Sequence, residues 1–376
     1  MIEVREVITK KDYKAFFAFP LKLYKNNKFY TPPLYGDDKK DFDVKRNPNL
    51  KVCQIKSFIA FKDGKIVGRI CAVYNPPADL KYHTKRLRFR HFDVIDDFEV
   101  TKALFKEVIK FAKEKGLNEI EGPNGFTDFD KEGMLFEGFE ERNIFITYYN
   151  YPYYITHMEK LGFKKATDWF EYRIKIPQEI DARLDRISDL VMRKGFKVIH
   201  AKKTKQLKPY ILDAFKVYNQ AFAKLYGTVN LTDEMVDYYM GSFLYLLNSD
   251  YLSIVTTNSG EVVGFAAVVP SLSKAVQKCH GKLFPFGFIN LLHALNHNDT
   301  IDMLLIAVAP DYQGKGINAI LMNEIHKACV RHHIIYAETG PELENNAEVQ
   351  AQWKNYERDI VRKRRLFISN LDDIKI

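Results

Sequence analysis

The sequence contains one local pattern twice, about half a chain apart, and this repeat limits the folds that the chain can adopt. Residues 58–73 read FIAFKDGKIVGRICAV, and residues 254–269 read IVTTNSGEVVGFAAVV. Each segment predicts two alternating strands joined by a turn dipeptide that ends in glycine, the strongest short-range signal for a β-hairpin. Gly68 and Gly264 occupy the same place in the two second strands. A chain of 376 residues with such a repeat is predicted to hold two tandem copies of one plan.

The segments that follow the two hairpins also correspond. Residues 88–96 and residues 301–310 each predict a strand that leads into an amphipathic helix. Each half then closes with a short strand ending in Gly-Pro, a helical segment and a final strand, FEYRIKI in the first half and RRLFISNL in the second. Because hairpins and a strand–helix–strand crossover alternate, the predicted class is α/β, or α+β, with a mixed sheet.

The boundary between the copies is predicted from the segment IPQEIDARLDRISDLVMRKGF, which has the pattern of a connecting helix. We expect a first domain over residues 1–177, a connecting helix or linker over residues 178–195, and a second domain over residues 196–376. Two such domains can share a groove or place their sheets side by side, and the sequence does not decide between these arrangements.

The most informative segment for chemistry is residues 306–325, IAVAPDYQGKGINAILMNEI. An apolar strand ends at Val308, and Gly314 and Gly316 precede an apolar-periodic helix. The amides of such a loop at a helix N-terminus favour a phosphate group, and Lys315 adds a full positive charge. The segment therefore predicts a binding loop for a diphosphate, although a tight turn with polar residues facing solvent is consistent with the same sequence. It is neither a Walker loop nor a Rossmann fingerprint.

This segment resembles the acetyl-CoA pyrophosphate loop of the GNAT acyltransferase superfamily. The family loop reads Gln or Arg, two residues, Gly, one residue, then Gly or Ala; Gln313 and Gly316 match, whereas Asn318 departs from the last position. The resemblance spans most of residues 196–376 and implies two tandem GNAT-like domains with acetyl-CoA or another acyl-CoA as co-substrate. The contacts that it implies are Val308, Gln313, Gly314, Lys315, Gly316, Ile317, Asn318 and Asn346. Asn346 also fits a helix N-cap.

The first half resembles the same fold without the loop. Where the glycines should stand, residues 95–102 read IDDFEVTK, and their acidic side chains would repel a diphosphate. Residues 147–163, which end in Leu-Gly-Phe, resemble the penultimate helix of the family. The resemblance therefore implies a degenerate first copy that supplies packing or one wall of the acceptor site.

The implied reaction is direct transfer of an acyl group, in the simplest case acetyl, from the CoA thioester to an amine. A backbone amide near Val308 would polarise the thioester carbonyl. Leu304 stands at the usual position of the family's base, so the base comes from elsewhere or from water. Asp302 and Glu338 are the candidates for catalytic acids or bases on the flanking strands, and a strand-end charge or a solvated acid is the plainer interpretation. Tyr356 is the candidate acid for the leaving thiolate, and a packed helix aromatic explains it equally well.

Two alternatives to an N-acetyltransferase stay open. The first is a non-catalytic acyl-CoA-binding or interaction module. In that case Leu304, Asn318 and Trp353, which depart from the family pattern, reflect the loss of catalytic activity. The second is a long-chain acyltransferase or aminoacyltransferase of the tandem type. The acceptor, a small-molecule or peptide amine, is unidentified, as are the acyl chain length and the oligomeric state.

Composition excludes several other classes. No stretch approaches the roughly 18 apolar residues of a membrane span, and the first residues carry no signal-peptide pattern, so a cytoplasmic protein is expected. The net charge of +9 suits an anionic nucleotide co-substrate, and nucleic acid is not an expected partner. Four scattered cysteines and the pair His293 and His297 lack the pattern of a metal site, so no metal is expected. The aromatic residues 279–297 are expected to form a lid over a pocket or a simple buried helix.

Overall fold

The computed structural model describes residues 1–34, 39–201, 203–243 and 248–376. The first half contains, in chain order, β1 (Ile2–Glu6), α1 (Lys10–Leu23), η1 (Pro48–Lys51), β2 (Gln54–Lys62), β3 (Lys65–Tyr74), α3 (Pro76–Tyr82), β4 (Arg86–Val94), α4 (Phe98–Glu114), β5 (Glu119–Gly122), β6 (Met134–Glu137), α5 (Tyr153–Lys160) and β7 (Lys164–Lys175). The second half contains α6 (Ala182–Met192), β8 (Phe196–Val198), η2 (Thr204–Tyr210), α7 (Ile211–Ala221), α8 (Asp233–Phe243), η3 (Ser249–Tyr251), β9 (Leu252–Thr257), β10 (Val262–Pro270), α9 (Ser273–Lys278), α10 (Gly287–Asn296), β11 (Thr300–Val308), η4 (Pro310–Tyr312), α11 (Ile317–Arg331), β12 (Tyr336–Thr339), β13 (Glu342–Leu343), α12 (Ala347–Ala351), β14 (Arg358–Asn370) and η5 (Leu371–Asp373).

Both predicted hairpins are present. β2 pairs antiparallel with β3, and β9 pairs antiparallel with β10. In the first hairpin, Asp63 and Gly64 have φ angles of 52° and 73°. A two-residue type I′ turn requires this left-handed conformation at both central positions, so the Asp-Gly dipeptide sets the register of the hairpin locally.

The two glycines of the repeat lie where a long helix crosses each hairpin. A Cβ atom on Gly68 would lie 2.9 Å from Leu104 Cδ1 of α4, and a Cβ atom on Gly264 would lie 2.9 Å from Ile317 Cγ2 of α11. Carbon atoms in good contact are about 3.5–4.0 Å apart, so neither position has room for a side chain. The glycines let α4 and α11 pack directly onto the strand backbone.

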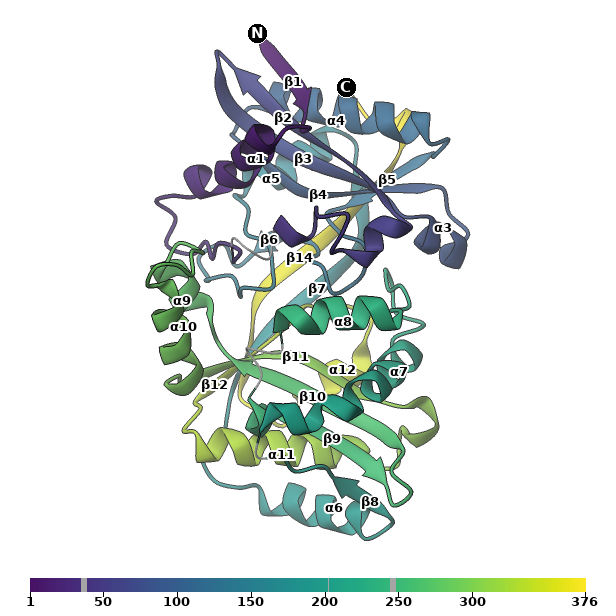
Figure 1. Cartoon of the computed structure of the whole chain (residues 1–376), viewed down its shortest axis with the longest axis vertical. Helices are drawn as coiled ribbons and strands as arrows, with labels where there is room; N and C mark the ends of the chain where they lie inside the picture. Colours follow the sequence, from purple (N-terminus) through teal and green to yellow (C-terminus); the bar gives the residue numbers. More distant parts are fainter. Residues whose placement is uncertain (35–38, 202, 244–247) are drawn as a thin grey trace.

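The strands of the two halves join into one continuous mixed sheet in the described part of the chain, which confirms the predicted class. The strand order is β1-β2-β3-β4-β5-β14-β7-β12-β11-β10-β9-β8, with β6 beside β14 and β13 beside β7. Figure 1 shows the first half above the second, with the yellow β14 running from one into the other. The two half-sheets therefore lie edge to edge. The sequence did not decide between this arrangement and a shared groove.

The closing strands of the two halves exchange places. β7 belongs to the first half in sequence, but it pairs with β12 of the second half, where Ala337 lies opposite Ile174. β14 ends the second half, but it pairs with β5 of the first half, where Ile368 lies opposite Glu121. β7 and β14 also pair antiparallel with each other at the centre of the sheet. Each half-sheet is completed by a strand from the other half. The domain boundary near residue 177 stays a prediction from the sequence.

A buried ion-pair network joins the exchanged strands. Arg362 and Arg364 of β14 are fully buried, and both donate to the buried carboxylate of Glu171 on β7. Arg362 also donates from Nη2 to Glu338 Oε2 of β12 at 2.6 Å. Burial alone would raise the pKa of Glu171, but the two guanidinium groups hold that pKa below its usual value. Loss of one partner would leave a buried charge unpaired, so the network makes the exchange specific.

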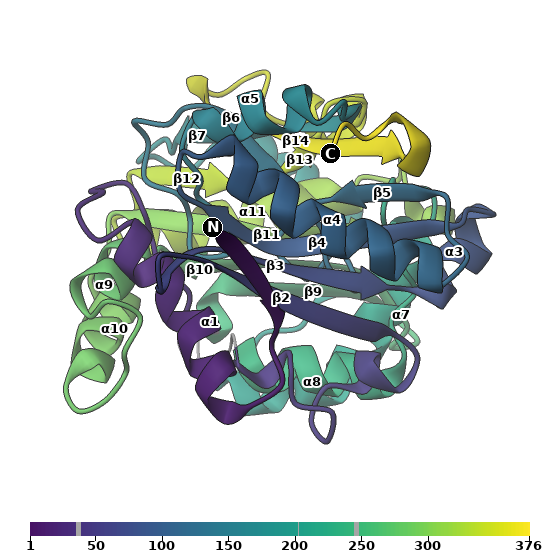
Figure 2. The ribbon, with the colours of Figure 1, turned by 90° about the horizontal axis from the view of Figure 1, so that it is seen from above.

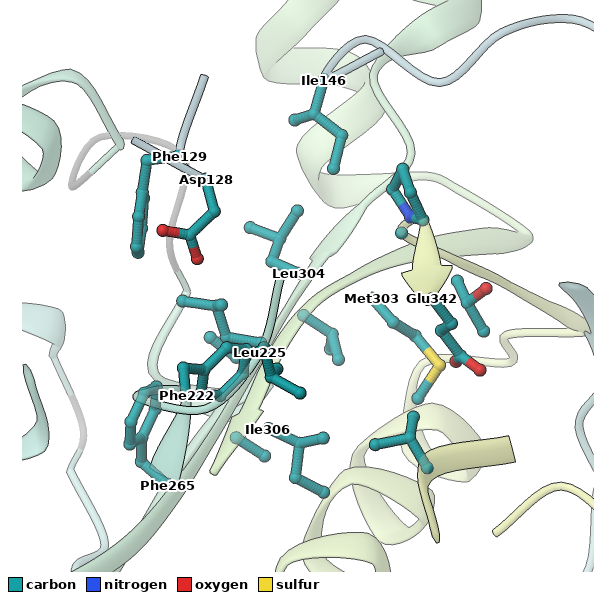
Figure 3. Close-up of a pocket in the computed structure, with 18 of the residues that line it drawn as sticks. Asp128, Phe129, Ile146, Phe222, Leu225, Phe265, Met303, Leu304, Ile306 and Glu342 are labelled. Atoms are coloured by element: carbon teal, nitrogen blue, oxygen red, sulfur yellow. The ribbon is translucent and has the colours of Figure 1, made fainter. Parts of the chain in front are cut away.

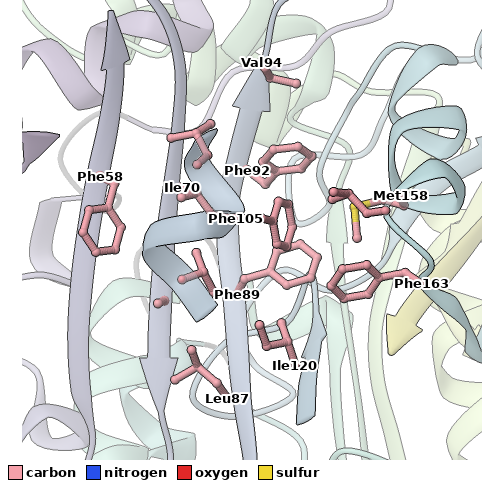
Figure 4. Packing of buried hydrophobic residues seen from close by; sticks show 14 of the residues in the cluster. Phe58, Ile70, Leu87, Phe89, Phe92, Val94, Phe105, Ile120, Met158 and Phe163 are labelled. Carbon is pink, nitrogen blue, oxygen red and sulfur yellow. The ribbon is translucent and has the colours of Figure 1, made fainter. Parts of the chain in front are cut away.

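Aromatic packing dominates the core of the first half. Phe105 of α4 lies edge-on to Phe89 and Phe92 of β4, with ring centroids 5.2 Å and 5.4 Å away. Figure 4 shows these rings between β4 and α4, with Phe163 closing the cluster from the start of β7. Edge-to-face pairs of this kind add to the free energy gained from burial alone.

Helices cover both faces of the sheet in the second half. Phe265 and Ala266 are successive residues of β10 and point to opposite faces, Phe265 toward α7 and Ala266 toward α11. Phe215 of α7 stacks on Phe265 with ring centroids 6.4 Å apart. None of the helices in the described ranges is long and apolar enough to cross a lipid bilayer.

Candidate active site

The sheet opens between β11 and β12. The two strands pair in parallel only from Thr300 to Met303. The amide of Gly340 donates to the carbonyl of Met303 at 3.0 Å, and the chain then leaves β11 at Pro341. On the other side of β11, Leu304 has no partner in the register with β10, which marks a β-bulge. The second part of β11 therefore borders a gap in the sheet.

A cavity of about 310 Å³ occupies this gap. Its wall is mainly apolar and draws on both faces of the sheet, including Phe222, Leu225, Phe265, Met303, Leu304 and Ile306. The first half supplies a further part of the wall through Asp128, Phe129, Ile146 and Trp169. Figure 3 shows Phe129 and Ile146 entering from that side. A largely apolar cavity with a few polar groups is typical of a binding site for an organic ligand.

Two carboxylic acids, Asp128 and Glu342, line opposite sides of this apolar cavity (Figure 3). Burial raises the pKa of Asp128 to about 7, and burial raises the pKa of Glu342 to about 7. Tyr218 donates to one oxygen of Asp128, and Trp353 Nε1 donates to Glu342 Oε1 at 2.8 Å. Within the described residues, the other oxygen of each acid has no hydrogen-bond partner. A carboxyl group with a pKa near neutrality and a free oxygen is suited to accept a proton from a substrate.

A third acid, Glu132, also lines the cavity. Burial, and next the charge of Asp128, raises the pKa of Glu132 well above its ordinary value. This carboxyl group therefore favours its neutral form beside Asp128. The sequence analysis did not identify any of the three acids, because Asp128 and Glu132 reach the site only through contacts between the halves.

The predicted acids Asp302 and Glu338 lie outside the wall of the cavity. Asp302 is fully buried on β11; burial raises its pKa to about 8, and the charge of neighbouring Glu338 adds to the rise. Glu338 lies between two guanidinium groups, with Arg173 Nη2 at 2.8 Å and Arg362 Nη2 at 2.6 Å. The structure therefore uses Glu338 in the ion-pair network, and the catalytic assignments of both acids stay predictions.

Tyr356 lines a smaller cavity of about 20 Å³ next to the large one. Met303, Met322 and Trp353 border both cavities. Burial raises the pKa of the Tyr356 phenol. The alternative interpretation of Tyr356, a packed helix aromatic, places it on a helix, but α12 ends at Ala351, so Tyr356 lies beyond the helix.

The glycine loop has the conformation that the sequence predicts. Gly314 and Gly316 have φ angles of 72° and 88°, and Gly316 is the N-cap of α11 with no side chain capping the helix. In the described part of the chain, no backbone carbonyl accepts from the amides of Gly314, Gly316, Ile317 and Asn318. Gln313 and Lys315 are exposed beside them. Unpaired amides at a helix N-terminus next to a lysine fit a diphosphate.

The amide of Val308 is directed toward the gap in the sheet. The amide of the next residue, Ala309, donates to Val263 of β10 at 2.9 Å. Successive amides of a strand point to opposite sides, so the amide of Val308 points away from β10, to the side where β12 has left. This is the geometry that a carbonyl-polarising amide needs. Asn346 lines the cavity and also caps α12, since its side chain accepts from the amide of Val349 at 3.4 Å.

The corresponding position in the first half holds a carboxylate. Asp97 is the N-cap of α4, where its side chain accepts from the amide of Glu99 at 3.1 Å. Lys62 forms an ion pair with the same carboxylate at 2.7 Å. A negative side chain at the helix N-terminus takes the place that a phosphate would need.

The comparisons agree with this geometry. Residues 215–350 match the sequence profile of the Acetyltransferase (GNAT) family. Over 99% of both chains, the fold is similar to the solved structure of a tandem GNAT protein from the clavulanic acid biosynthesis pathway, with a TM-score of 0.57 and 11% identity. Residues 215–350 thus match a GNAT domain, and the whole chain has the tandem GNAT fold. A GNAT protein from Sphaerobacter thermophilus is also similar, with a TM-score of 0.53 and 10% identity over 98% of this chain and 96% of that chain.

Two curated proteins are similar to this chain in sequence. Protein YghO of Escherichia coli K12 is 27% identical over 377 residues, which is 95% of each chain. The bacterial ceramide synthase of Caulobacter vibrioides is 24% identical over 303 residues, which is 78% of this chain and 76% of that protein. The predicted superfamily and the tandem arrangement are thus confirmed, and the family is one of acyltransferases that use acyl-CoA as co-substrate.

Residues 279–297 were expected to form either a lid over a pocket or a simple buried helix, and the structure shows neither. Residues 271–298 form α9, α10 and their connection, and no residue of this range lines the cavity. Leu291 packs into a cluster with Leu304, but much of α10 is exposed. The segment is neither a lid over the cavity nor a buried helix.

Proposed function

We propose that this protein transfers a long acyl chain from an acyl-CoA to an amine and so forms an amide. The apolar cavity beside the free edge of β11 carries the proposal. Its volume of about 310 Å³ is about twenty to thirty times the roughly 10–15 Å³ that one water molecule needs. An acetyl group would leave most of this apolar space unfilled, whereas an alkyl chain would fill it and gain burial along its length.

The name of one relative agrees with a long acyl chain as the transferred group. The Caulobacter protein is called a ceramide synthase. A ceramide is an amide between a long-chain acid and an amino alcohol, so the reaction named there joins an acyl group to an amine on an apolar molecule. At 24% identity this supports the class of reaction for our chain, and the acceptor stays unidentified.

In the proposed reaction, the loop amides of Gly314, Gly316 and Ile317 hold the diphosphate of the acyl-CoA, with Lys315 beside them. The amide of Val308 donates to the thioester carbonyl as it gains negative charge. The amine attacks the carbonyl carbon, and the carbon–sulfur bond then breaks to release the CoA thiolate.

Glu342 is our candidate for the general base. It directly follows the Gly-Pro segment that leaves the sheet, and it faces the cavity with one free carboxylate oxygen. Asp128 lies across the cavity and is the alternative proton acceptor. Tyr356 serves as the acid for the thiolate only if the sulfur reaches the small cavity behind Met303.

The test is a chain-length series. The protein is incubated with acyl-CoA from two to sixteen carbons and with amines that include a long-chain amino alcohol, and amide and free thiol are measured. We expect kcat/KM to rise with chain length, because each buried methylene contributes at most about 0.8 kcal/mol.

Two results would count against the proposal. Acetyl-CoA that reacts as well as long acyl-CoA with the same amine would contradict the long-chain assignment. Tight acyl-CoA binding with no amide from any acceptor would favour the non-catalytic binding module.

A further inference from the structure

α9 and α10 form a hairpin at one side of the molecule. Figures 1 and 2 show the two helices standing out from the body of the second half, next to the start of the first half. The hairpin is attached through a buried cluster, in which Leu272, Val276 and Leu291 pack with Phe145, and through hydrogen bonds from Gln277 to the carbonyls of Lys28 and Tyr30. Several large apolar side chains of the hairpin are exposed to solvent.

The exposed side of the hairpin is strongly apolar. Phe284 is 79% exposed and Phe286 is 71% exposed, in the connection before α10. Phe288, Ile289 and Leu292 follow on one face of α10 and are exposed as well. We call these five side chains the hairpin patch. Scattered apolar residues are normal on a surface, but five large ones within nine residues mark an interaction site.

The hairpin has a uniform charge. Residues 271–298 contain no Asp or Glu, and they contain three exposed lysines, Lys274, Lys278 and Lys282, of which Lys274 lies 4.0 Å from Asp299 just after this range. Lys28 lies close by, since its carbonyl accepts from Gln277 Nε2 at 3.0 Å. Large apolar side chains beside lysines, with no acidic side chain among them, are typical of helices that lie on an anionic membrane surface.

We propose that the hairpin patch docks on the surface of an anionic lipid bilayer. The phenylalanines would enter the boundary between headgroups and acyl chains, and the lysines would contact lipid phosphates. α10 has 10 residues, which is half of what a membrane span needs, so it lies in the interface and does not cross it. A second copy of the chain fits less well, because a symmetric dimer would bring lysines against lysines with no acidic partner.

Docking would also bring the large cavity close to lipid. Ile146 and Leu304 line the cavity and also pack against the buried side of the hairpin. One layer of side chains therefore separates the hairpin from the cavity. This link to a lipid acceptor or acyl donor rests on the proposed function, whereas the docking itself does not.

The experiment measures binding of the full chain to sedimented vesicles without substrate. Vesicles of phosphatidylcholine are compared with vesicles that also contain phosphatidylglycerol. We expect binding to the anionic vesicles that weakens as salt is added. The triple variant Phe284→Ser/Phe286→Ser/Phe288→Ser should bind at least about tenfold more weakly.

A charge variant and a control complete the design. Lys278→Glu/Lys282→Glu should weaken binding to anionic vesicles by roughly fivefold for each lysine lost. Ile8→Ser/Leu80→Ser removes two apolar side chains that are 74% and 78% exposed elsewhere, and should bind as the wild type does. The thermal unfolding temperature of each variant verifies that it is folded.

Three outcomes would overturn the proposal. These are no binding of the wild type to anionic vesicles, equal binding by the triple variant, and a wild-type dimer in size-exclusion chromatography that the triple variant abolishes. Because no acyl transfer is measured, a failure of docking and a failure of the proposed reaction are separate results.

Discussion

Replacing Glu342 by Gln should make the protein more stable and much less active. The pKa of Glu342 is raised from 4.5 to about 7, mainly by burial. Each pKa unit corresponds to about 1.36 kcal/mol, so the folded protein loses about 3 kcal/mol when this carboxyl group is ionised. Gln keeps the shape and the oxygen that accepts from Trp353, but it carries no charge to bury.

The sign of the pH dependence follows from proton binding. The folded state holds the proton on Glu342 up to about pH 7, whereas the unfolded chain releases it near pH 4.5. Between these values the folded state binds more protons, so this group makes the wild type less stable as pH rises. The stability advantage of Glu342→Gln should therefore be near zero at low pH, grow through this window and stay level above it.

The catalytic activity of Glu342→Gln should fall, although its stability rises. A positioned general base contributes about 10²–10⁴ in rate, so Glu342→Gln should lower kcat by a factor in that range. The wild-type kcat/KM should rise with pH through about 7, with Asp128 contributing to the same transition.

The assays are urea unfolding at several pH values and amide formation from a long acyl-CoA. Glu348→Gln is the matched control, because Glu348 is exposed on α12 and should change neither quantity appreciably. A variant that is less stable than the wild type at pH 7, with no pH dependence in the difference, would refute the burial argument. A variant with full activity would refute the role as base.

Three further substitutions test other parts of the molecule. Gly316→Asp should weaken acyl-CoA binding by at least tenfold in a calorimetric titration, because it adds a negative charge beside the expected diphosphate and because its Cβ, at φ 88°, would lie 2.6 Å from Val191 Cγ2. Asp311→Asn, at an exposed residue outside the expected contacts, is the control and should bind as the wild type does, and thermal unfolding verifies that both variants are folded. Gly264→Ala should destabilise the protein by about 1–3 kcal/mol, because its Cβ would overlap α11; an unchanged urea midpoint would contradict this packing. Arg362→Met should cost about 3–5 kcal/mol by leaving Glu171 short of one partner, and thermal unfolding at the wild-type temperature would show that the network is dispensable.

Local features of this fold could be predicted from the sequence. The turn of the first hairpin follows from its Asp-Gly dipeptide, whereas the second hairpin turns through three residues, 258–260, with only Gly260 at positive φ. The loop before α11 follows from two glycines after an apolar strand, because φ angles and turn types depend on neighbouring residues. The connecting helix α6 was also predicted from its periodicity. These features depend on residues close together in sequence, so they can be recognised in a single sequence.

The strand exchange could not be predicted, because β7 and β14 are both alternating strands and either could close either half-sheet. The cavity acids were missed for a related reason, since Asp128 reaches the site through contacts between residues far apart in sequence. Glu342 had one readable signal, its place directly after the Gly-Pro that ends β12. The sequence pattern also does not show that α12 ends at Ala351, before Tyr356.

The exchanged closing strands also constrain how this chain is made. β14 fills the edge of β5, although β5 is synthesised about 250 residues earlier. The edge of β5 therefore stays unpaired until β14 has been synthesised, and a fragment cut at the connecting helix would keep that edge exposed. Expression of either half alone should give aggregates, whereas the two halves produced together could rebuild the shared sheet.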